Sequence, residues 1–194
     1  MTVASELQLR PNPALYLGGG FLIALISAVA LPWTSAVAST TLGTLMIAGA
    51  DVDARTLLLP DRITIGALLL GLAFAPVLDP PEPWYAFGTA MGRAAGVAFV
   101  LAVVRWGYAR IRSEEGLGLG DVKLAAVGGA WLALAAIPLW LGLASTAALV
   151  AVVLARLRSQ AIDRTTRVPF GAFLCPALWL VFFLSALMDN ILLG

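Results

Sequence analysis

Long apolar segments separated by short polar connections make up most of the chain. Seven such segments come close to the ~17–25 residues that a membrane-spanning helix needs, over residues 14–33, 37–52, 63–78, 85–106, 122–137, 139–157 and 171–193. Backbone polar groups in lipid must be paired within their own segment, so each one is predicted to be a helix. The pattern predicts an all-α, polytopic membrane protein with about seven transmembrane helices.

Proline residues mark the predicted connections. Pro32 follows the first segment, Pro60 follows the second, a proline cluster over 79–83 follows the third, and Pro138 separates the fifth from the sixth. Residues 1–13 are polar and proline-containing, and no small-residue cleavage pattern follows them. We therefore expect a short cytoplasmic tail over 1–13 and one transmembrane domain over 14–194.

Composition narrows the possible chemistry. Hydrophobic residues make up 61% of the chain and charged residues 12%, and the formal net charge of +1 offers no basic surface for nucleic acid. The single cysteine, Cys175, excludes an internal disulfide and a cysteine-based zinc cluster. The absence of histidine excludes Ser-His and Cys-His nucleophiles. If the protein is an enzyme, its carboxylates must carry the reaction, without a metal or cofactor.

The basic residues are distributed on one side of the predicted topology. With a cytoplasmic N-terminus, 11 of the 12 basic residues lie on or near the cytoplasmic side, which is the usual bias. They are Arg10, Arg55, Arg62, Arg105, Arg110, Arg112, Lys123, Arg156, Arg158, Arg164 and Arg167. The twelfth, Arg93, lies inside the fourth segment, where burial predicts a partner acid or a wet cavity. The same topology places Asp53 and Asp121 on the cytoplasmic side, at segment boundaries.

Two facing aspartates can hydrolyse a peptide bond. A carboxylate at membrane depth costs ~2.5–3.5 kcal/mol on insertion scales, which makes it a candidate functional residue. Two carboxylates held close together cannot both ionise easily, so one can serve as base while its protonated partner polarises a carbonyl. Gly118 and Gly120 precede Asp121 and allow a close backbone approach. A position at a helix N-terminus would lower the pKa of Asp121, so Asp53 is the expected proton holder.

Three separate motifs resemble those of one known family. Residues 118–124 are similar to the Gly-x-Gly-Asp signature of the prepilin peptidases, or type IV leader peptidases, which are intramembrane aspartic proteases. Residues 53–61 resemble the first catalytic stretch of that family, in which an Asp lies seven residues before the Pro of a Leu-Pro-Asp element. This register selects Asp53 over Asp51. Residues 168–171 resemble the family's Pro-Phe-Gly element, and 129–131 also fit.

The resemblance implies a function and a set of site residues. The catalytic residues would be Asp53 and Asp121. The residues expected to bind substrate or shape the site are Gly118, Gly120, Lys123, Pro60, Asp61, Pro169, Phe170 and Gly171. The enzyme would cleave the basic leader of prepilins or pseudopilins at the cytoplasmic face of the bacterial inner membrane. Longer members also carry a domain with paired Cys-x-x-Cys motifs and methylate the product from S-adenosylmethionine. The resemblance therefore predicts a short, peptidase-only form.

Simpler interpretations remain beside these. Asp121 could be a plain helix N-cap, Lys123 could extend toward the membrane surface, and Asp51 and Asp61 could be structural. The tryptophans mostly fall near segment ends, as in an interfacial belt. Glu114 and Glu115 could attract a basic leader.

Two other classes of protein stay open. A proton-coupled transporter also uses intramembrane acids, although the chain shows no internal repeat. A membrane phosphotransferase would bind Mg²⁺ through a few carboxylates and substrate phosphates. Its candidate residues are Asp51, Asp53, Asp61, Arg55 and Arg62.

Overall fold

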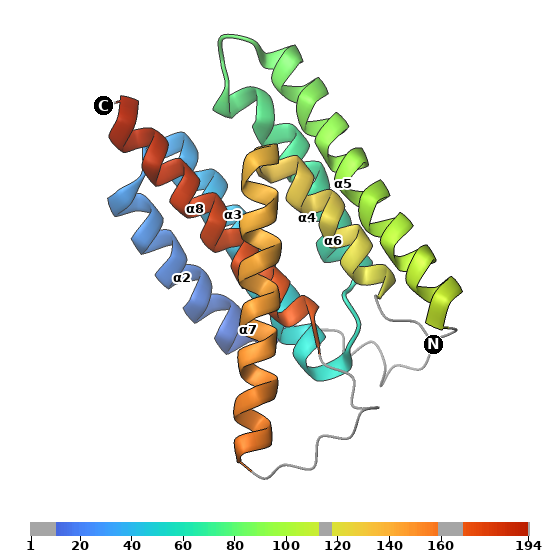
Figure 1. Ribbon diagram of the computed structural model, residues 1–194. Helices are drawn as coiled ribbons and strands as arrows, with labels where there is room; N and C mark the ends of the chain where they lie inside the picture. The colour runs from blue at the N-terminus through green and yellow to red at the C-terminus, as the bar shows by residue number, and fades with distance from the viewer. Residues whose placement is uncertain (1–10, 113–117, 159–168, 194) are drawn as a thin grey trace.

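The computed structural model describes residues 11–112, 118–158 and 169–193, and these residues are almost entirely helical (Figure 1). The elements are α2 (Pro13–Ala30), α3 (Trp33–Thr56), α4 (Asp61–Leu78), α5 (Pro83–Arg112), α6 (Leu119–Trp131), a 3₁₀ turn η1 (Leu134–Ala136), α7 (Ile137–Leu157) and α8 (Gly171–Leu193). Within the described ranges, six helices are long and apolar enough to cross a membrane. The predicted all-α, polytopic membrane protein is confirmed.

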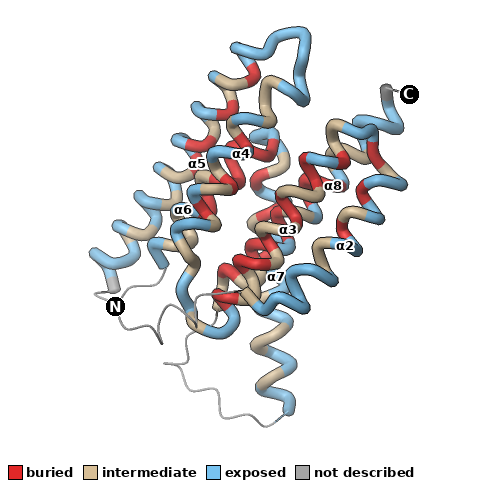
Figure 2. The backbone as a smooth tube through the Cα atoms, turned by 180° about the vertical axis from the view of Figure 1, so that it is seen from behind, coloured by how far each residue is buried: buried red, intermediate tan, exposed pale blue. Residues whose placement is uncertain are grey.

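The helices form two packed groups. α2, α3 and α8 lie together on one side, and α4, α5 and α6 on the other, while α7 crosses over them and packs on α8 (Figure 1). Contacts of α3 with α4 and of α6 with α8 join the groups. Figure 2 shows buried segments on the facing sides of α3, α6 and α8. The core is therefore where the two groups meet.

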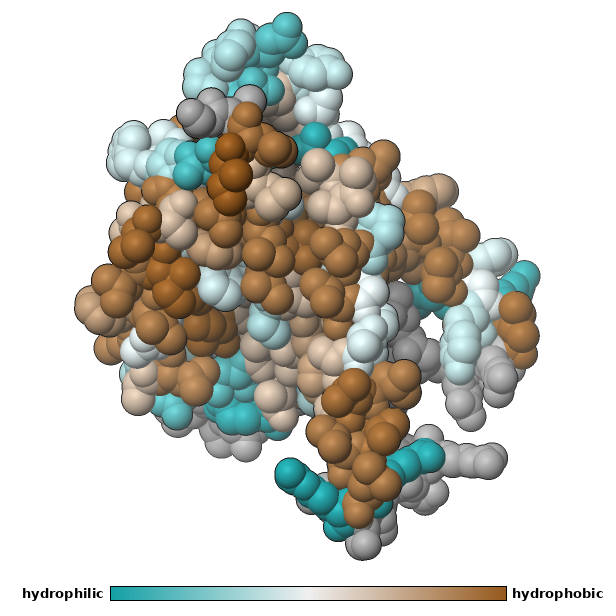
Figure 3. All heavy atoms as spheres, turned by 60° about the vertical axis from the view of Figure 1, so that its left-hand side comes forward, coloured by the Kyte–Doolittle hydropathy of each residue, from teal (hydrophilic) through white to brown (hydrophobic). Residues whose placement is uncertain are grey.

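Hydrophobic side chains also cover much of the outside. In Figure 3 they fill the middle of the visible face, and hydrophilic side chains gather toward its ends. Such a surface suits lipid, because lipid provides no hydrophobic penalty for exposed apolar side chains. The connections between α3 and α4 and the first turn of α6 lie at one end of the bundle, at the bottom of Figure 1. The α4–α5 connection, with Asp79 and Glu82, lies at the opposite end.

The fifth predicted segment differs from the structure. α6 ends at Trp131, because Leu132 is extended (φ −105°, ψ 148°). The predicted break at Pro138 is wrong: Pro138 lies in the first turn of α7, where a missing backbone N–H is tolerated. The 13 residues of α6 rise about 20 Å, less than the ~30 Å hydrocarbon core of a bilayer. α6 is therefore a short central helix, and not the fifth of seven full spans as the sequence pattern predicts.

Two glycines allow α6 to lie at the centre. A Cβ at Gly128 would lie 2.1 Å from the Trp140 ring, and a Cβ at Gly129 would lie 2.5 Å from the Arg93 carbonyl oxygen. Glycine is needed here because the Trp140 ring of α7 and the backbone of α5 lie directly against α6. Arg93 Nε donates to the Gly129 carbonyl oxygen at 3.3 Å. The sequence predicts an acid or a wet cavity beside Arg93, whereas the structure places a backbone carbonyl of α6 there.

Three of the six tryptophans are not in an interfacial belt, contrary to the sequence-based interpretation. Trp131 and Trp140 are buried, and their indole N–H groups donate to the carbonyls of Ala67 (2.8 Å) and Leu174 (2.9 Å). Trp179 donates to the Ser39 hydroxyl at 3.1 Å. These bonds join α6 to α4, α7 to α8 and α8 to α3, so the tryptophans fix the relative positions of the helices that carry the site.

Candidate active site

Asp53 and Asp121 both lie at the end of the bundle where α8 packs on α3 and on α6. Asp53 lies in the last turn of α3, slightly deeper than predicted, because α3 continues to Thr56. Asp121 lies in the first turn of α6. The negative charge of Asp53 contributes to raising the pKa of Asp121, so the two carboxyls interact electrostatically. The buried Cys175 lies within electrostatic reach of both carboxyls.

The Asp53 carboxylate is bound by the N-terminus of α8. Asp53 is only 6% exposed, and its Oδ2 accepts a hydrogen bond from the Ala172 amide at 2.8 Å. The Gly171 amide donates to the same carboxylate. The first amides of a helix lack intrahelical partners and lie at its positive end, so they suit a carboxylate. α8 therefore supplies the hydrogen bonds that permit burial of this acid.

Gly171 makes the contact possible. A Cβ at this position would lie 2.8 Å from both Cγ and Oδ2 of Asp53. One turn further along each helix, a Cβ at Gly49 would lie 3.2 Å from the Cys175 sulfur. α3 and α8 are thus packed closely over two successive turns. Phe170 completes the start of α8, because its carbonyl accepts the amides of Phe173 and Leu174, each at 3.0 Å. The predicted Pro169-Phe170-Gly171 element is brought directly to Asp53.

Asp121 is held by its own glycine loop. Its Oδ2 accepts the Gly118 amide at 3.2 Å, and its amide donates to the Gly118 carbonyl at 3.2 Å. Burial raises the pKa of Asp121 to about 6, against the lowering effect of the Gly118 amide, and the nearby Asp53 charge adds to the increase. The prediction that the helix N-terminus would lower this pKa is wrong, because the loss of water outweighs one amide hydrogen bond.

The loop from Leu57 to Pro60 lies between the two acids in sequence and against α6 in space. Leu57 ends α3 in the left-handed region (φ 56°), which costs a residue with a Cβ about 1–2 kcal/mol. The Thr56 hydroxyl bonds to the Leu58 carbonyl at 3.2 Å and accepts the Leu58 amide at 3.3 Å. A Cβ at Gly120 would lie 3.1 Å from the Leu59 Cβ, so the first turn of α6 rests directly on this loop. Pro60 then caps the start of α4.

The remaining charged residues at this end are separated from the pair. Asp51 pairs with Arg55 at 2.6 Å and accepts the Asn12 amide at 2.8 Å, toward α2. Asp61 pairs with Lys123, which joins the first turn of α4 to the second turn of α6. Both Asp61 and Lys123 are largely exposed. Asp51 therefore has structural partners.

Among the described residues, Asp51, Asp53 and Asp61, the candidate acids of a phosphotransferase, each have different partners. Asp51 pairs with Arg55, Asp53 binds the α8 amides and Asp61 pairs with Lys123. In the part of the chain that the structure covers, no group of three His, Cys, Asp or Glu side chains is placed to hold a metal ion. Glu114 and Glu115, predicted to attract a basic leader, lie outside the described residues.

Sequence reasoning missed several residues that shape the site. Ala172 contributes through its backbone amide, which no side-chain pattern can reveal. Leu59 and Cys175 are ordinary apolar positions in the sequence, and only packing places them next to Gly120 and Gly49. The one available signal was the spacing of Gly49 and Asp53, which puts both on one face of a helix.

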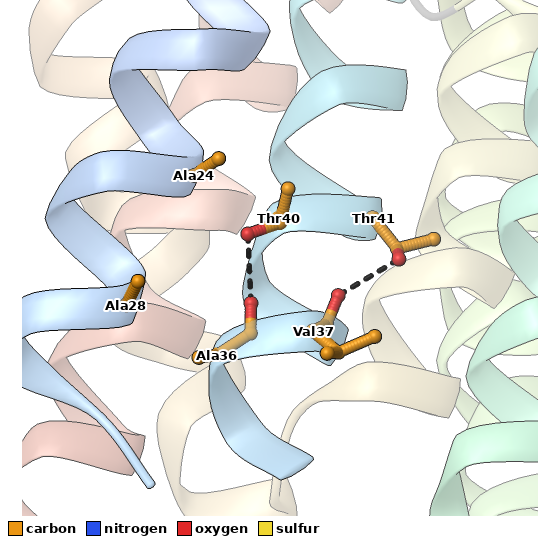
Figure 4. A pocket seen from close by; sticks show the side chains of 6 residues that line it. All are labelled: Ala24, Ala28, Ala36, Val37, Thr40 and Thr41. Carbon is orange, nitrogen blue, oxygen red and sulfur yellow. Dashed lines mark hydrogen bonds between the residues drawn. The ribbon is translucent and has the colours of Figure 1, made fainter. Parts of the chain in front are cut away.

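A shallow groove on the lipid-facing side is separate from the carboxyls. It lies between α2 and α3 and is lined by Ala24, Ala28, Ala36, Val37, Thr40 and Thr41 (Figure 4). The hydroxyls of Thr40 and Thr41 each donate to a carbonyl of their own helix at 2.8 Å (Figure 4). With its hydroxyls satisfied in this way, the groove offers no acid or base for a reaction.

Comparisons with known proteins point to one family. Residues 40–153 match the model of the type IV leader peptidase family. This range contains both Asp53 and Asp121, whereas Pro169, Phe170 and Gly171 lie beyond it. The leader peptidase HopD of Escherichia coli is 38% identical over 125 residues, which are 64% of this chain and 78% of HopD. No solved structure shows a significant match.

Two further relatives carry a double name. The prepilin leader peptidase/N-methyltransferase of Xanthomonas campestris pv. campestris is 35% identical over 142 residues, covering 71% of this chain and 46% of that protein. The protein of the same name from Escherichia coli strain K12 is 37% identical over 127 residues, covering 63% of this chain and 52% of its own length. The chain thus spans about half the length of these two relatives.

The interaction between the two carboxyls can be measured directly. Carbon-13 NMR of Asp-labelled protein in detergent should show Asp121 titrating near its raised pKa of about 6. In Asp53→Asn the midpoint should fall, because removing a neighbouring negative charge favours the ionised form. Asp51→Asn is the control and should leave the midpoint unchanged, since Asp51 is paired with Arg55. An unchanged Asp121 midpoint in Asp53→Asn would show that the carboxyls do not interact.

Proposed function

Because this chain belongs to the type IV leader peptidase family, we propose that it is an intramembrane aspartic endopeptidase with Asp53 and Asp121 as its catalytic pair. The observation that carries the proposal is that both carboxyls lie at one end of the bundle, near enough to interact electrostatically, each with its own backbone hydrogen bonds. Both lie within the range that matches the family.

The geometry supports different roles for the two acids. Burial disfavours the ionised form of Asp53, whereas the amides that it accepts from the positive end of α8 favour that form. Asp121 retains its proton up to about pH 6, because burial and the Asp53 charge raise its pKa. We therefore assign the base that activates water to Asp53 and the proton that polarises the scissile carbonyl to Asp121. This assignment reverses the one expected from sequence.

The reaction then requires no covalent intermediate. Asp53 takes a proton from water, the hydroxide attacks the carbonyl carbon, and the Asp121 proton stabilises the developing charge on the carbonyl oxygen. Collapse of the tetrahedral species breaks the C–N bond, and the proton held by Asp53 passes to the leaving amine. As the carbonyl re-forms, the hydroxyl that received the Asp121 proton returns it to Asp121, and both carboxyls are back in their starting states.

The substrate and orientation follow from the relatives and from the charge distribution. The relatives are named as leader and prepilin leader peptidases, and we propose prepilins or pseudopilins as substrates here. The pair lies at the end of the bundle where Arg55, Arg62, Arg156 and Arg158 lie. By the positive-inside bias this end faces the cytoplasm of a bacterial inner membrane.

Replacing either acid tests the assignment. Asp53→Asn and Asp121→Asn should each lower prepilin cleavage by at least about 10⁴-fold in detergent or vesicles, because each removes the ionisable group while keeping its size. Cleavage is measured by the mass of the released leader. Asp51→Asn is the matched control, because Asp51 lies two residues earlier in α3 and points to another side of the helix. This variant should retain activity. Loss of activity in Asp51→Asn with retention in Asp53→Asn would contradict the assignment.

The contact of α8 with Asp53 makes a second test possible. Gly171→Ala should lower kcat by about 10²-fold, because the added Cβ would lie 2.8 Å from the Asp53 carboxylate and would displace it. Gly88→Ala is a suitable control, since a Cβ at Gly88 has open space around it. Cleavage and thermal unfolding are measured for both variants. Full activity in Gly171→Ala would mean that this close approach does not position Asp53.

We also propose that these 194 residues carry out proteolysis alone. The relatives named for both activities align with the chain over only about half of their own length. Purified protein incubated with a prepilin and S-adenosylmethionine should therefore yield a cleaved product of unmodified mass. A product heavier by one methyl group in that mixture would contradict this part of the proposal.

A further inference from the structure

The ion pair between Asp61 and Lys123 joins the two helices that begin next to the catalytic pair. Lys123 Nζ contacts Asp61 Oδ1, across 62 positions of sequence. Asp61 is the first residue of α4, and Lys123 lies in the second turn of α6, two residues after Asp121. The ion pair therefore links the start of α4 to the turn that carries Asp121.

Lys123 cannot act on the reacting atoms from this position. Residues two apart on a helix project in directions about 200° apart, so Lys123 faces α4 while Asp121 faces away from α4. The side chain of Lys123 is 46% exposed and that of Asp61 is 61% exposed. An exposed pair of this kind adds little to global stability. Its effect must be sought in the local position of α6.

The packing of α4 on α6 shows why the site end needs a separate contact. At the deep end, the Trp131 indole bonds to the Ala67 carbonyl at 2.8 Å, and a Cβ at Gly71 would lie 2.6 Å from the indole nitrogen. Trp131 lies ten residues after Asp121, about 15 Å along the helix axis. The core packing of α6 begins at Leu124, so the turn before it, which carries Asp121, depends on contacts of its own. At the site end, Gly120 approaches Leu59 of the loop before α4, and the ion pair reaches α4 itself.

We infer that Asp61 and Lys123 are a pair of positioning residues that holds the first turn of α6, and with it Asp121, in register with Asp53. The loop that enters α4 needs such support, because it begins with Leu57 in the left-handed region and the first turn of α6 rests on Leu59. Loss of the ion pair would let this turn move by a fraction of an ångström. A displacement of about 1 Å at a catalytic group can cost about 10²-fold in rate.

Four variants test the inference. Lys123→Met and Asp61→Asn should each lower kcat by at least about tenfold while KM changes by less than about threefold, because substrate contacts are kept and the catalytic geometry is not. The melting temperature should stay close to that of the wild type. The exchanged pair Asp61→Lys with Lys123→Asp should recover most of kcat. Arg62→Met is the matched control: it removes an exposed positive charge from the same turn of α4 and should change nothing.

A second readout does not depend on proteolysis. Amide hydrogen exchange in residues 119–124 should increase in Lys123→Met and Asp61→Asn, and return to the wild-type rate in the exchanged pair. The cleavage measurements rest on the proposed function. If the wild-type protein cleaves no prepilin, that function is refuted. The hydrogen-exchange measurements then decide the inference on their own. Single variants that match Arg62→Met in both readouts would overturn the inference. A folded exchanged pair as impaired as the single variants would overturn it as well.

Discussion

Burial of the Asp53 carboxylate against the first amides of α8 is the constraint on which the rest of the site depends. An ionised carboxylate cannot be removed from water without hydrogen bonds in return, and here the Ala172 and Gly171 amides provide them. The contact requires a residue without a side chain at Gly171 and fixes the register of α8 on α3. Because α8 also receives the Trp140 indole of α7, the position of α7 follows from the same contact.

The short central helix α6 brings a second acid, Asp121, from another part of the chain to the same end of the bundle as Asp53. α6 begins close to Asp53 and ends inside the bundle, so its first turn can present Asp121 to the interior. Gly128 accommodates the Trp140 ring, Gly129 accommodates the α5 backbone, and Gly120 lets the helix rest on Leu59. The glycines of this helix therefore determine how close the backbones come, and the carboxyls interact as a result.

Much of this arrangement could be predicted from sequence. Hydrophobic segment length gave the helical membrane fold, and the charge bias placed Asp53 and Asp121 on one side before any packing was known. The motif register selected Asp53, and the structure gives Asp51 other partners. The prediction of the fold is confirmed because it depends on segment length and on the bilayer, which act along the chain, whereas the role of Asp53 stays a prediction.

The errors share a physical cause. The end of α6 at Trp131, the burial of Trp131 and Trp140, and the carbonyl partner of Arg93 all depend on which helices touch. The raised pKa of Asp121 depends on the loss of water around it, which a helix-terminus argument leaves out. Sequence patterns predict which segments are helices, whereas desolvation and interhelical hydrogen bonds are set by tertiary packing.

The most direct test of the central claim is the affinity of a transition-state analogue, a prepilin peptide in which a hydroxyl-bearing tetrahedral carbon replaces the scissile bond. Such a group is recognised by a pair of carboxyls acting together, and transition-state analogues bind far more tightly than substrates. Calorimetry should show tight binding by the wild type and by Asp51→Asn, with a loss of at least about 10²-fold in Asp53→Asn and in Asp121→Asn. Equal affinity in all four proteins would contradict the claim that these two aspartates form one catalytic site.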